Sequence, residues 1–195
     1  MDIDNDYISN TFIDIKLIYN AISHYKNIGF KMISVPSCVD LESTLHSIPL
    51  EKREYIKPIA RNKLCGSYYV GSAEQSFIYL YSKNLIDEGY YMAITPCVRD
   101  EIEDELHLGL FLKIELILIG EENIDKMLNF SYSFFKQLSD NLKIVDSGNK
   151  LFEKDIMIND IEVGSYGIGK MLDGKVYTYG TGIAEPRLSL ALSQK

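Results

Sequence analysis

Apolar side chains recur every three or four residues in several stretches of the chain, which is the spacing of one buried helix face. The clearest stretch covers residues 7–25, and Gly29 follows it as a residue suited to end a helix. The same spacing predicts helices over residues 73–85 and 121–141 and a short one over 188–192. Helices are therefore expected along the whole chain, with a long amphipathic one near its start.

Alternation of apolar and polar side chains dominates the centre of the chain. Residues 90–97 are rich in aromatic and β-branched side chains, and residues 107–116 carry aliphatic side chains at alternate positions. A short acidic loop joins the two segments, so we expect a β-hairpin. Further strands are expected over residues 30–35, 66–71, 142–145, 152–158, 161–166 and 175–179, and residues 39–63 are expected to form short helices and loop.

The order of these elements predicts the fold class. The later strands follow one another through short turns such as Asp173-Gly174, rather than alternating strictly with helices. This order favours an α+β fold, a mostly antiparallel β-sheet flanked by helices. We find no internal repeat and no composition break that would mark a linker, so residues 1–195 are expected to form a single domain.

One face of the central hairpin gathers chemically active side chains. Because side chains alternate across a strand, Arg99 and Glu101 share a face of the first strand, and His107, Phe111 and Glu115 share a face of the second. A ring, an arginine and carboxylates suit a nucleotide with its phosphates and Mg²⁺. The alternative is an amphipathic hairpin whose polar face is only solvated.

A second stretch with functional character lies near the C-terminus. Gly180, Gly182 and Ala184 would allow a ligand to approach the backbone closely, and Arg187 follows at the start of the last predicted helix. The alternative is a glycine-rich strand end that only allows a helix to pack closely.

Composition and charge narrow the class of protein. The net charge of -8 argues against a broad nucleic-acid-binding surface. No run of the chain reaches the roughly 18 apolar residues of a membrane span, and the first residues lack a basic flank, so we expect a cytoplasmic protein without a membrane partner. Three scattered cysteines are expected to be free thiols.

Taken together, these features resemble the catalytic core of class II aminoacyl-tRNA synthetases, closest to the seryl branch. Residues 7–36 are similar to the first family motif, a long helix and a strand ending in a proline. The second motif, Arg-x-Glu, a loop, and then spaced His, Phe and acid, is matched by Arg99, Glu101, His107, Phe111 and Glu115. The third is matched by Gly180, Gly182, Ala184 and Arg187.

The resemblance implies that ATP, with Mg²⁺, binds the hairpin face. Arg99 would hold the α-phosphate and act in catalysis, and Phe111 would stack on the adenine. Arg187 would cover the other side of the adenine and reach the γ-phosphate. His107 would contact a second phosphate, and Glu101 would lie near the adenine or the motif loop.

The resemblance also implies metal and substrate contacts. Glu115 would be the main Mg²⁺ ligand and Glu162 a second one. Ser72 and Glu74 resemble the family element that receives the α-amino group of the amino acid. For Glu74 the alternative is a carboxylate that only stabilises a helix start.

Two positions depart from the family pattern at the ATP site, and one loop departs where the tRNA acceptor end would approach. Pro186 replaces a residue that is usually acidic or glycine, and His107 stands where the seryl branch has arginine. Residues 100–105 hold five acids in six positions, which would repel a tRNA backbone. We therefore expect a free-standing core without an anticodon-binding domain. The match to the first motif implies a homodimer through residues 7–25 and 30–35.

Three functions remain open at this point. The first is adenylation of an amino acid or related carboxylate, with transfer to a carrier protein or small molecule. The second is a catalytically silent relative that binds amino acid or nucleotide and regulates or assembles with a partner. The third is minimal aminoacylation of tRNA.

Overall fold

A computed structural model describes residues 13–48, 53, 58–62, 64, 66–100, 104, 106–147 and 153–194. Within them, one large sheet has the strand order β1-β5-β6-β10-β9-β8-β7, in which only the β1–β5 pair is parallel. Its strands are β1 (Lys31–Met32), β5 (Gly89–Val98), β6 (Leu110–Ile119), β7 (Leu142–Asp146), β8 (Lys154–Ile158), β9 (Ile161–Lys170) and β10 (Val176–Glu185).

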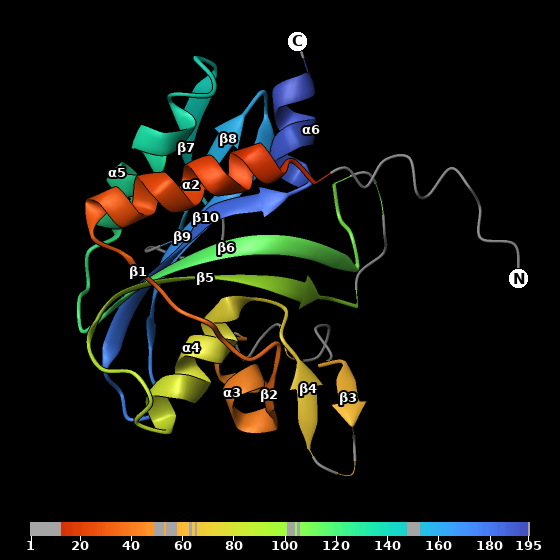
Figure 1. The fold of residues 1–195 in the computed structure, drawn as a ribbon, viewed down its shortest axis with the longest axis vertical. Coiled ribbons are helices and arrows are strands. Elements are labelled where there is room, and N and C mark those ends of the chain that lie inside the picture. Colours follow the sequence, from red (N-terminus) through yellow and green to blue (C-terminus); the bar gives the residue numbers. More distant parts are fainter. Residues whose placement is uncertain are drawn as a thin grey trace, which may run out of the picture.

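A small antiparallel sheet lies beside the large one, with the order β2-β4-β3 (Figure 1). Its strands are β2 (Cys38–Asp40), β3 (Ala60–Asn62) and β4 (Ser67–Tyr69). β4 leads directly into the helix α4, so this small sheet fixes the start of that helix beside the large sheet.

Helices cover both faces of the large sheet (Figure 1). Alternate side chains of β6 enter the two cores: Leu116 and Leu118 pack on the side of α2, α5 and α6, and Ile117 and Ile119 on the side of α4. None of the described helices is both long and apolar enough to cross a membrane. The helices are α2 (Ile15–Ile28), α3 (Leu41–His46), α4 (Ala73–Ser82), α5 (Ile124–Phe135) and α6 (Arg187–Ser193).

The expected α+β class, a mostly antiparallel sheet flanked by helices, is confirmed. Gly29 ends α2 as expected, with a positive φ of 113° that glycine adopts without strain. Residues 7–12 of the first expected helix lie outside the described residues. The expectation of only helix and loop over residues 39–63 was wrong, because β3 and part of β2 lie there.

Two expected boundaries also differ. The second hairpin strand begins at Leu110 and not at His107, because the Asp104 side chain accepts hydrogen bonds from the backbone N–H groups of Leu106 and His107 and holds a turn. β10 continues to Glu185 through the glycine-rich stretch that we expected to leave the strand. The functional stretch near the C-terminus is therefore a sheet strand and not a loop.

β10 contains a bulge at Gly182. Thr181 pairs with Glu115, and the next paired residue, Ile183, pairs with Ile114, so Gly182 is an extra residue. A Cβ on Gly182 would lie 2.8 Å from Ile114 Cγ2, and the Gly182 carbonyl accepts a 3.0 Å hydrogen bond from the buried Tyr25 hydroxyl of α2. The bulge therefore fits α2 closely onto the sheet.

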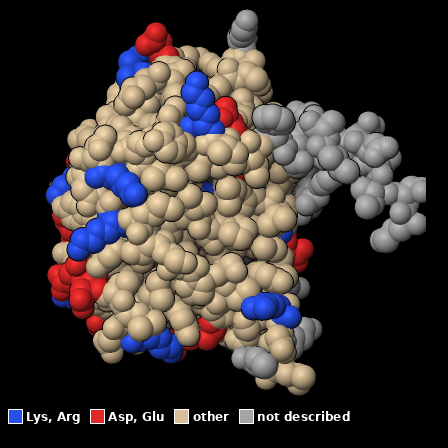
Figure 2. Space-filling view, in the orientation of Figure 1, with Lys and Arg blue, Asp and Glu red and all other residues tan. Residues whose placement is uncertain are grey.

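Apolar side chains are exposed on α2 and on β1, the end strand of the large sheet. Ile15 and Tyr19 are 69% and 68% exposed, and Met32 is 41% exposed. In the view of Figure 2 the charged side chains are scattered and leave broad uncharged areas. Exposed apolar surface of this kind suits contact with another protein surface.

We expect the chain to form a homodimer through α2 and β1 at micromolar concentration. Tyr19→Glu should weaken the dimer by about tenfold or more, because a charge would enter an apolar contact. Leu85→Glu, at a 65% exposed position just after α4, is the matched control and should leave the dimer intact. Sedimentation velocity measures the oligomer, and a monomeric parent protein would contradict the expectation.

Candidate active site

A cavity of about 670 Å³ opens on the α4 side of the large sheet. Its wall comes from the ends of β4 and β5, the start of α4, and the cavity-facing residues of β6, β9 and β10. Six of the predicted site residues line it: Ser72, Glu74, Arg99, Phe111, Glu162 and Arg187.

Arg99 and Phe111 contact each other on this wall. The guanidinium carbon of Arg99 lies 5.0 Å from the centroid of the Phe111 ring, a cation–π contact. The Arg99 Nε donates a 3.0 Å hydrogen bond to the Gly71 carbonyl, and the Gly71 N–H donates to Gln75 Oε1. The start of α4 therefore positions the arginine over the ring.

A buried ion pair lies beneath the cavity floor. Glu115 Oε2 is 2.7 Å from Lys113 Nζ and also accepts a hydrogen bond from the Ser72 hydroxyl. Glu115 is fully buried, does not line the cavity, and its Oε1 has no partner. Lys113 does line the cavity, so the carboxylate holds an ammonium group at the cavity surface.

Ser72 connects this ion pair to α4. It is the N-cap residue of α4, and its hydroxyl oxygen accepts from the Glu74 backbone N–H. The same hydroxyl donates its proton to Glu115 Oε2. One side chain therefore begins the helix and fixes Glu74 relative to the sheet.

Glu74 is a carboxyl group with an unusual proton affinity. Its Oε1 accepts a 2.6 Å hydrogen bond from the Tyr177 hydroxyl. Burial, together with the negative charge of Glu115, raises the pKa of Glu74 to about 7, although the tyrosine hydrogen bond lowers it. Near neutral pH the group is therefore divided between its ionised and protonated forms.

The opposite end of the cavity carries Arg187 and two carboxylates. Arg187 Nη1 lies 3.4 Å from Glu162 Oε1, and its Nε donates to the Leu106 carbonyl. Asp155 lines the same part of the cavity; burial raises its pKa, the nearby Glu162 charge adds to this, and its Oδ1 has no partner. In the described residues no three His, Cys, Asp or Glu side chains form a metal-binding group.

The carboxylates of Asp155 and Glu162 are suitable ligands for a nucleotide-bound Mg²⁺. Mg²⁺ in nucleotide sites is usually held by one or two carboxylates together with the substrate phosphates, so three protein ligands are not required. The unpartnered oxygen of Asp155 supplies a ligand of the preferred kind.

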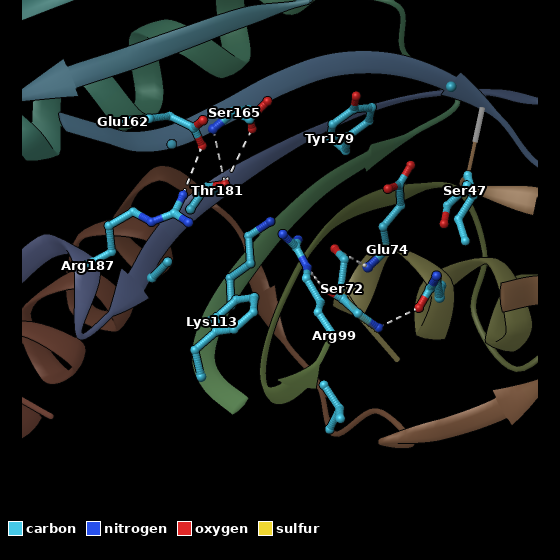
Figure 3. Close-up of a pocket in the computed structure, with 18 of the residues that line it drawn as sticks. Ser47, Ser72, Glu74, Arg99, Lys113, Glu162, Ser165, Tyr179, Thr181 and Arg187 are labelled. Carbon is cyan, nitrogen blue, oxygen red and sulfur yellow. Dashed lines mark hydrogen bonds and ion pairs between the residues drawn. The ribbon is translucent and has the colours of Figure 1, made fainter. Parts of the chain in front are cut away.

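The cavity is divided by charge (Figure 3). In that view Arg187 lies beside Glu162 on one side, Lys113 and Arg99 lie side by side in the middle, and Glu74 and Tyr179 lie beyond Arg99. A ligand with an anionic part and an amino group would match this division.

Two of the described predicted residues, His107 and Glu115, do not line the cavity. His107 lies in the turn before β6, with Nδ1 2.9 Å from Asp104 Oδ1, and does not line the cavity. Glu101 lies outside the described residues. Sequence reasoning missed Lys113, Asp155, Tyr177 and Tyr179; the alternation of Phe111 with Glu115 already put Lys113 on the same strand face.

The raised pKa of Glu74 predicts a pH-dependent stability. The unfolded carboxyl titrates near 4.5 and the folded one near 7, so the parent protein loses stability as pH rises between these values. Glu74→Gln removes this loss, so the variant should gain up to about 3 kcal/mol relative to the parent between pH 4.5 and 8. Urea unfolding at several pH values measures the difference, and parallel curves would refute the assignment.

No protein-family model and no curated protein sequence matches this chain. Solved structures do match it. Seryl-tRNA synthetase from Pyrococcus horikoshii complexed with ATP superimposes with a TM-score of 0.74 at 17% identity, over 92% of this chain and 49% of that one. Pyrrolysyl-tRNA synthetase from Desulfitobacterium hafniense gives 0.70 at 14% identity, over 90% and 68%.

A cytoplasmic serine-tRNA ligase from Naegleria fowleri in complex with AMP gives a TM-score of 0.69 at 16% identity, over 93% of this chain and 55% of that one. The chain thus spans about half the length of the seryl enzymes it matches. These likenesses agree with the motifs in the sequence, and the protein has a class II aminoacyl-tRNA synthetase-like fold.

Proposed function

We propose that the protein activates an amino acid, or a related carboxylate, with ATP. The observation that carries the proposal is the charge division of one cavity, with cations beside an aromatic ring at one part and Glu74 at another. ATP and an amino acid together present phosphates, a base, a carboxylate and an amino group, which match these parts in kind.

In the proposed reaction a carboxylate oxygen of the substrate attacks the α-phosphorus of ATP. The new bond joins that oxygen to phosphorus, the bond to the oxygen bridging to the β-phosphate breaks, and pyrophosphate leaves with the electron pair. Arg99 stabilises the charge that develops on the α-phosphate, and Arg187 binds the outer phosphates. Phe111 stacks on the adenine.

Glu74 binds the α-amino group of the substrate by charge pairing. A positive group beside it favours the ionised carboxylate, so binding draws the proton off a group that is half protonated near pH 7. Lys113, held by Glu115, lies beside Arg99 in the view of Figure 3 and suits the substrate carboxylate.

Mg²⁺ is proposed as the companion of ATP. Glu162 is the better of the two predicted ligands because it lines the cavity, whereas Glu115 is buried and already neutralised by Lys113. Asp155 is a further candidate. When bound, Mg²⁺ would neutralise charge on the phosphates.

A second candidate function is binding without chemistry. The observation that favours it is the contact between Arg99 and Phe111, together with the Arg187–Glu162 pair, because these groups engage each other. A silent relative could bind an amino acid or nucleotide and regulate a partner. Exchange of labelled pyrophosphate into ATP, dependent on an amino acid, separates the two functions.

Arg99→Ala should lower the rate of this exchange about a hundredfold, because a charge-assisted contact to the developing phosphate charge is lost, and should lower ATP affinity less. Arg61→Ala is the matched control, since Arg61 is exposed on β3 and does not line the cavity. Equal exchange rates for Arg99→Ala and the parent would exclude the proposed role.

The acyl acceptor is proposed to be a carrier protein or a small molecule. The supporting features are the net charge of -8 and the acidic residues 100–105 between the two strands of the hairpin. On the face drawn in Figure 2, Lys and Arg side chains are scattered and do not gather into a basic patch.

Bulk tRNA is therefore expected to bind only weakly at physiological salt, because few phosphates can be neutralised. A fluorescence titration at about 50 and 150 mM salt measures this. Asp100→Asn combined with Asp104→Asn should strengthen binding at the lower salt. Submicromolar, salt-sensitive binding by the parent would restore minimal tRNA aminoacylation as the function.

A further inference from the structure

Arg187 is held by a turn from a distant part of the chain. Its Nε donates a 3.0 Å hydrogen bond to the carbonyl of Leu106, which lies 81 residues earlier, in the turn before β6. Both residues line the cavity. The cation at the start of α6 therefore takes part of its orientation from the end of the central hairpin.

The side chain of Asp104 builds that turn. Its Oδ1 accepts hydrogen bonds from the backbone N–H of Leu106 at 2.8 Å and from that of His107 at 2.7 Å. The Asp104 N–H donates to the His107 carbonyl at 3.0 Å. The His107 ring and the two backbone N–H groups lower the pKa of Asp104, so this exposed carboxyl group is ionised at neutral pH.

The peptide group between Leu106 and His107 connects the two sets of contacts. The Leu106 carbonyl and the His107 N–H belong to one planar group, and in a trans peptide they point in opposite directions. Because Asp104 holds the N–H on one side, the carbonyl is directed to the other side, where Arg187 lies. One rigid unit therefore transmits orientation from the carboxylate to the guanidinium.

The second partner of Arg187 differs from this carbonyl in kind. Glu162 Oε1 lies 3.4 Å from Arg187 Nη1 in a partly exposed ion pair, which stabilises the arginine little (Figure 3). Phosphates would approach the Nη groups and compete with this carboxylate. The Leu106 carbonyl bonds the Nε instead, so it can stay in place when a nucleotide occupies the cavity.

We propose that Asp104 is a positioning residue, which orients Arg187 toward the outer phosphates of ATP through the Leu106–His107 peptide group. The proposal rests on the proposed function, in which Arg187 binds those phosphates. His107 then contributes through its backbone. Its ring, for which the motif predicted a phosphate contact, lies against Asp104 instead, with Nδ1 2.9 Å from Oδ1.

ATP and AMP are the matched probes, because only ATP carries the outer phosphates. Calorimetry in the presence of Mg²⁺ measures the binding of each. Asp104→Ala should weaken ATP binding about tenfold and leave AMP binding unchanged, because the guanidinium loses its orientation toward the outer phosphates. Asp104→Asn should keep most of the ATP affinity, since its amide oxygen can accept the same two N–H bonds. Asp140→Ala is the matched control, because this exposed carboxylate pairs with Lys136 outside the cavity.

A double-mutant cycle tests whether Asp104 acts through Arg187. Arg187→Ala should weaken ATP binding at least as much as Asp104→Ala does. Adding Asp104→Ala to Arg187→Ala should have no further effect, because the turn then has no guanidinium to orient. His107→Ala should leave ATP affinity unchanged, since the backbone N–H remains. Urea unfolding of each variant verifies that it is folded.

The outcomes separate this inference from the proposed function. A loss for ATP and not for AMP, which disappears when Arg187 is absent, supports the inference. Unchanged ATP affinity in Asp104→Ala, equal losses for ATP and AMP, or additive losses in the double variant overturn the inference and leave the proposed function standing. The expected pattern without any pyrophosphate exchange supports the inference and contradicts the adenylation step. A parent protein that binds neither nucleotide contradicts both.

Discussion

The ion pair between Glu115 and Lys113 is the interaction on which the cavity depends. A carboxylate that is fully buried is stable only when a charge and hydrogen bonds compensate it, and here Lys113 and the hydroxyl of Ser72 do so. The pair joins the centre of the sheet to the first turn of α4. Loss of either partner would leave an uncompensated charge beneath the cavity floor.

The Glu115–Lys113 ion pair also affects the charged groups that line the cavity. The Lys113 ammonium faces the cavity because its counter-charge lies below, and the Glu115 charge contributes to the raised pKa of Glu74. Two neighbouring carboxyl groups thus differ in role: Glu115 is paired with a lysine, and Glu74 is close to half protonated at neutral pH. A carboxyl group with a raised pKa that lines a cavity is typical of sites that bind and convert charged ligands.

The fold and much of the cavity were predictable because they follow from local patterns. Alternation along β5 and β6 identified the hairpin, and the spacing of Arg99, Phe111 and Glu115 on it identified one face. Burial was not predictable in the same way. Alternation predicts on which face of the strand Glu115 lies, but not whether a neighbouring side chain covers it. Here the side chain of Lys113, two residues away, pairs with the Glu115 carboxylate.

The remaining differences arise from contacts between segments distant in the sequence. His107 follows an Asp104 side chain that holds a turn, a local interaction that competes with the strand pattern. Tyr177 and Tyr179 acquire their position from glycines on the neighbouring strand, and that pairing requires the register of β9 and β10. A single sequence contains both partners but not their alignment.

The bulge at Gly182 links α2 on one side of the sheet to a strand that lines the cavity on the other. The Tyr25 hydroxyl of α2 donates to the carbonyl of the bulged residue, and Thr181 beside it lines the cavity. A small shift of α2 would therefore be transmitted through one hydrogen bond to the strand that carries Tyr177 and Tyr179.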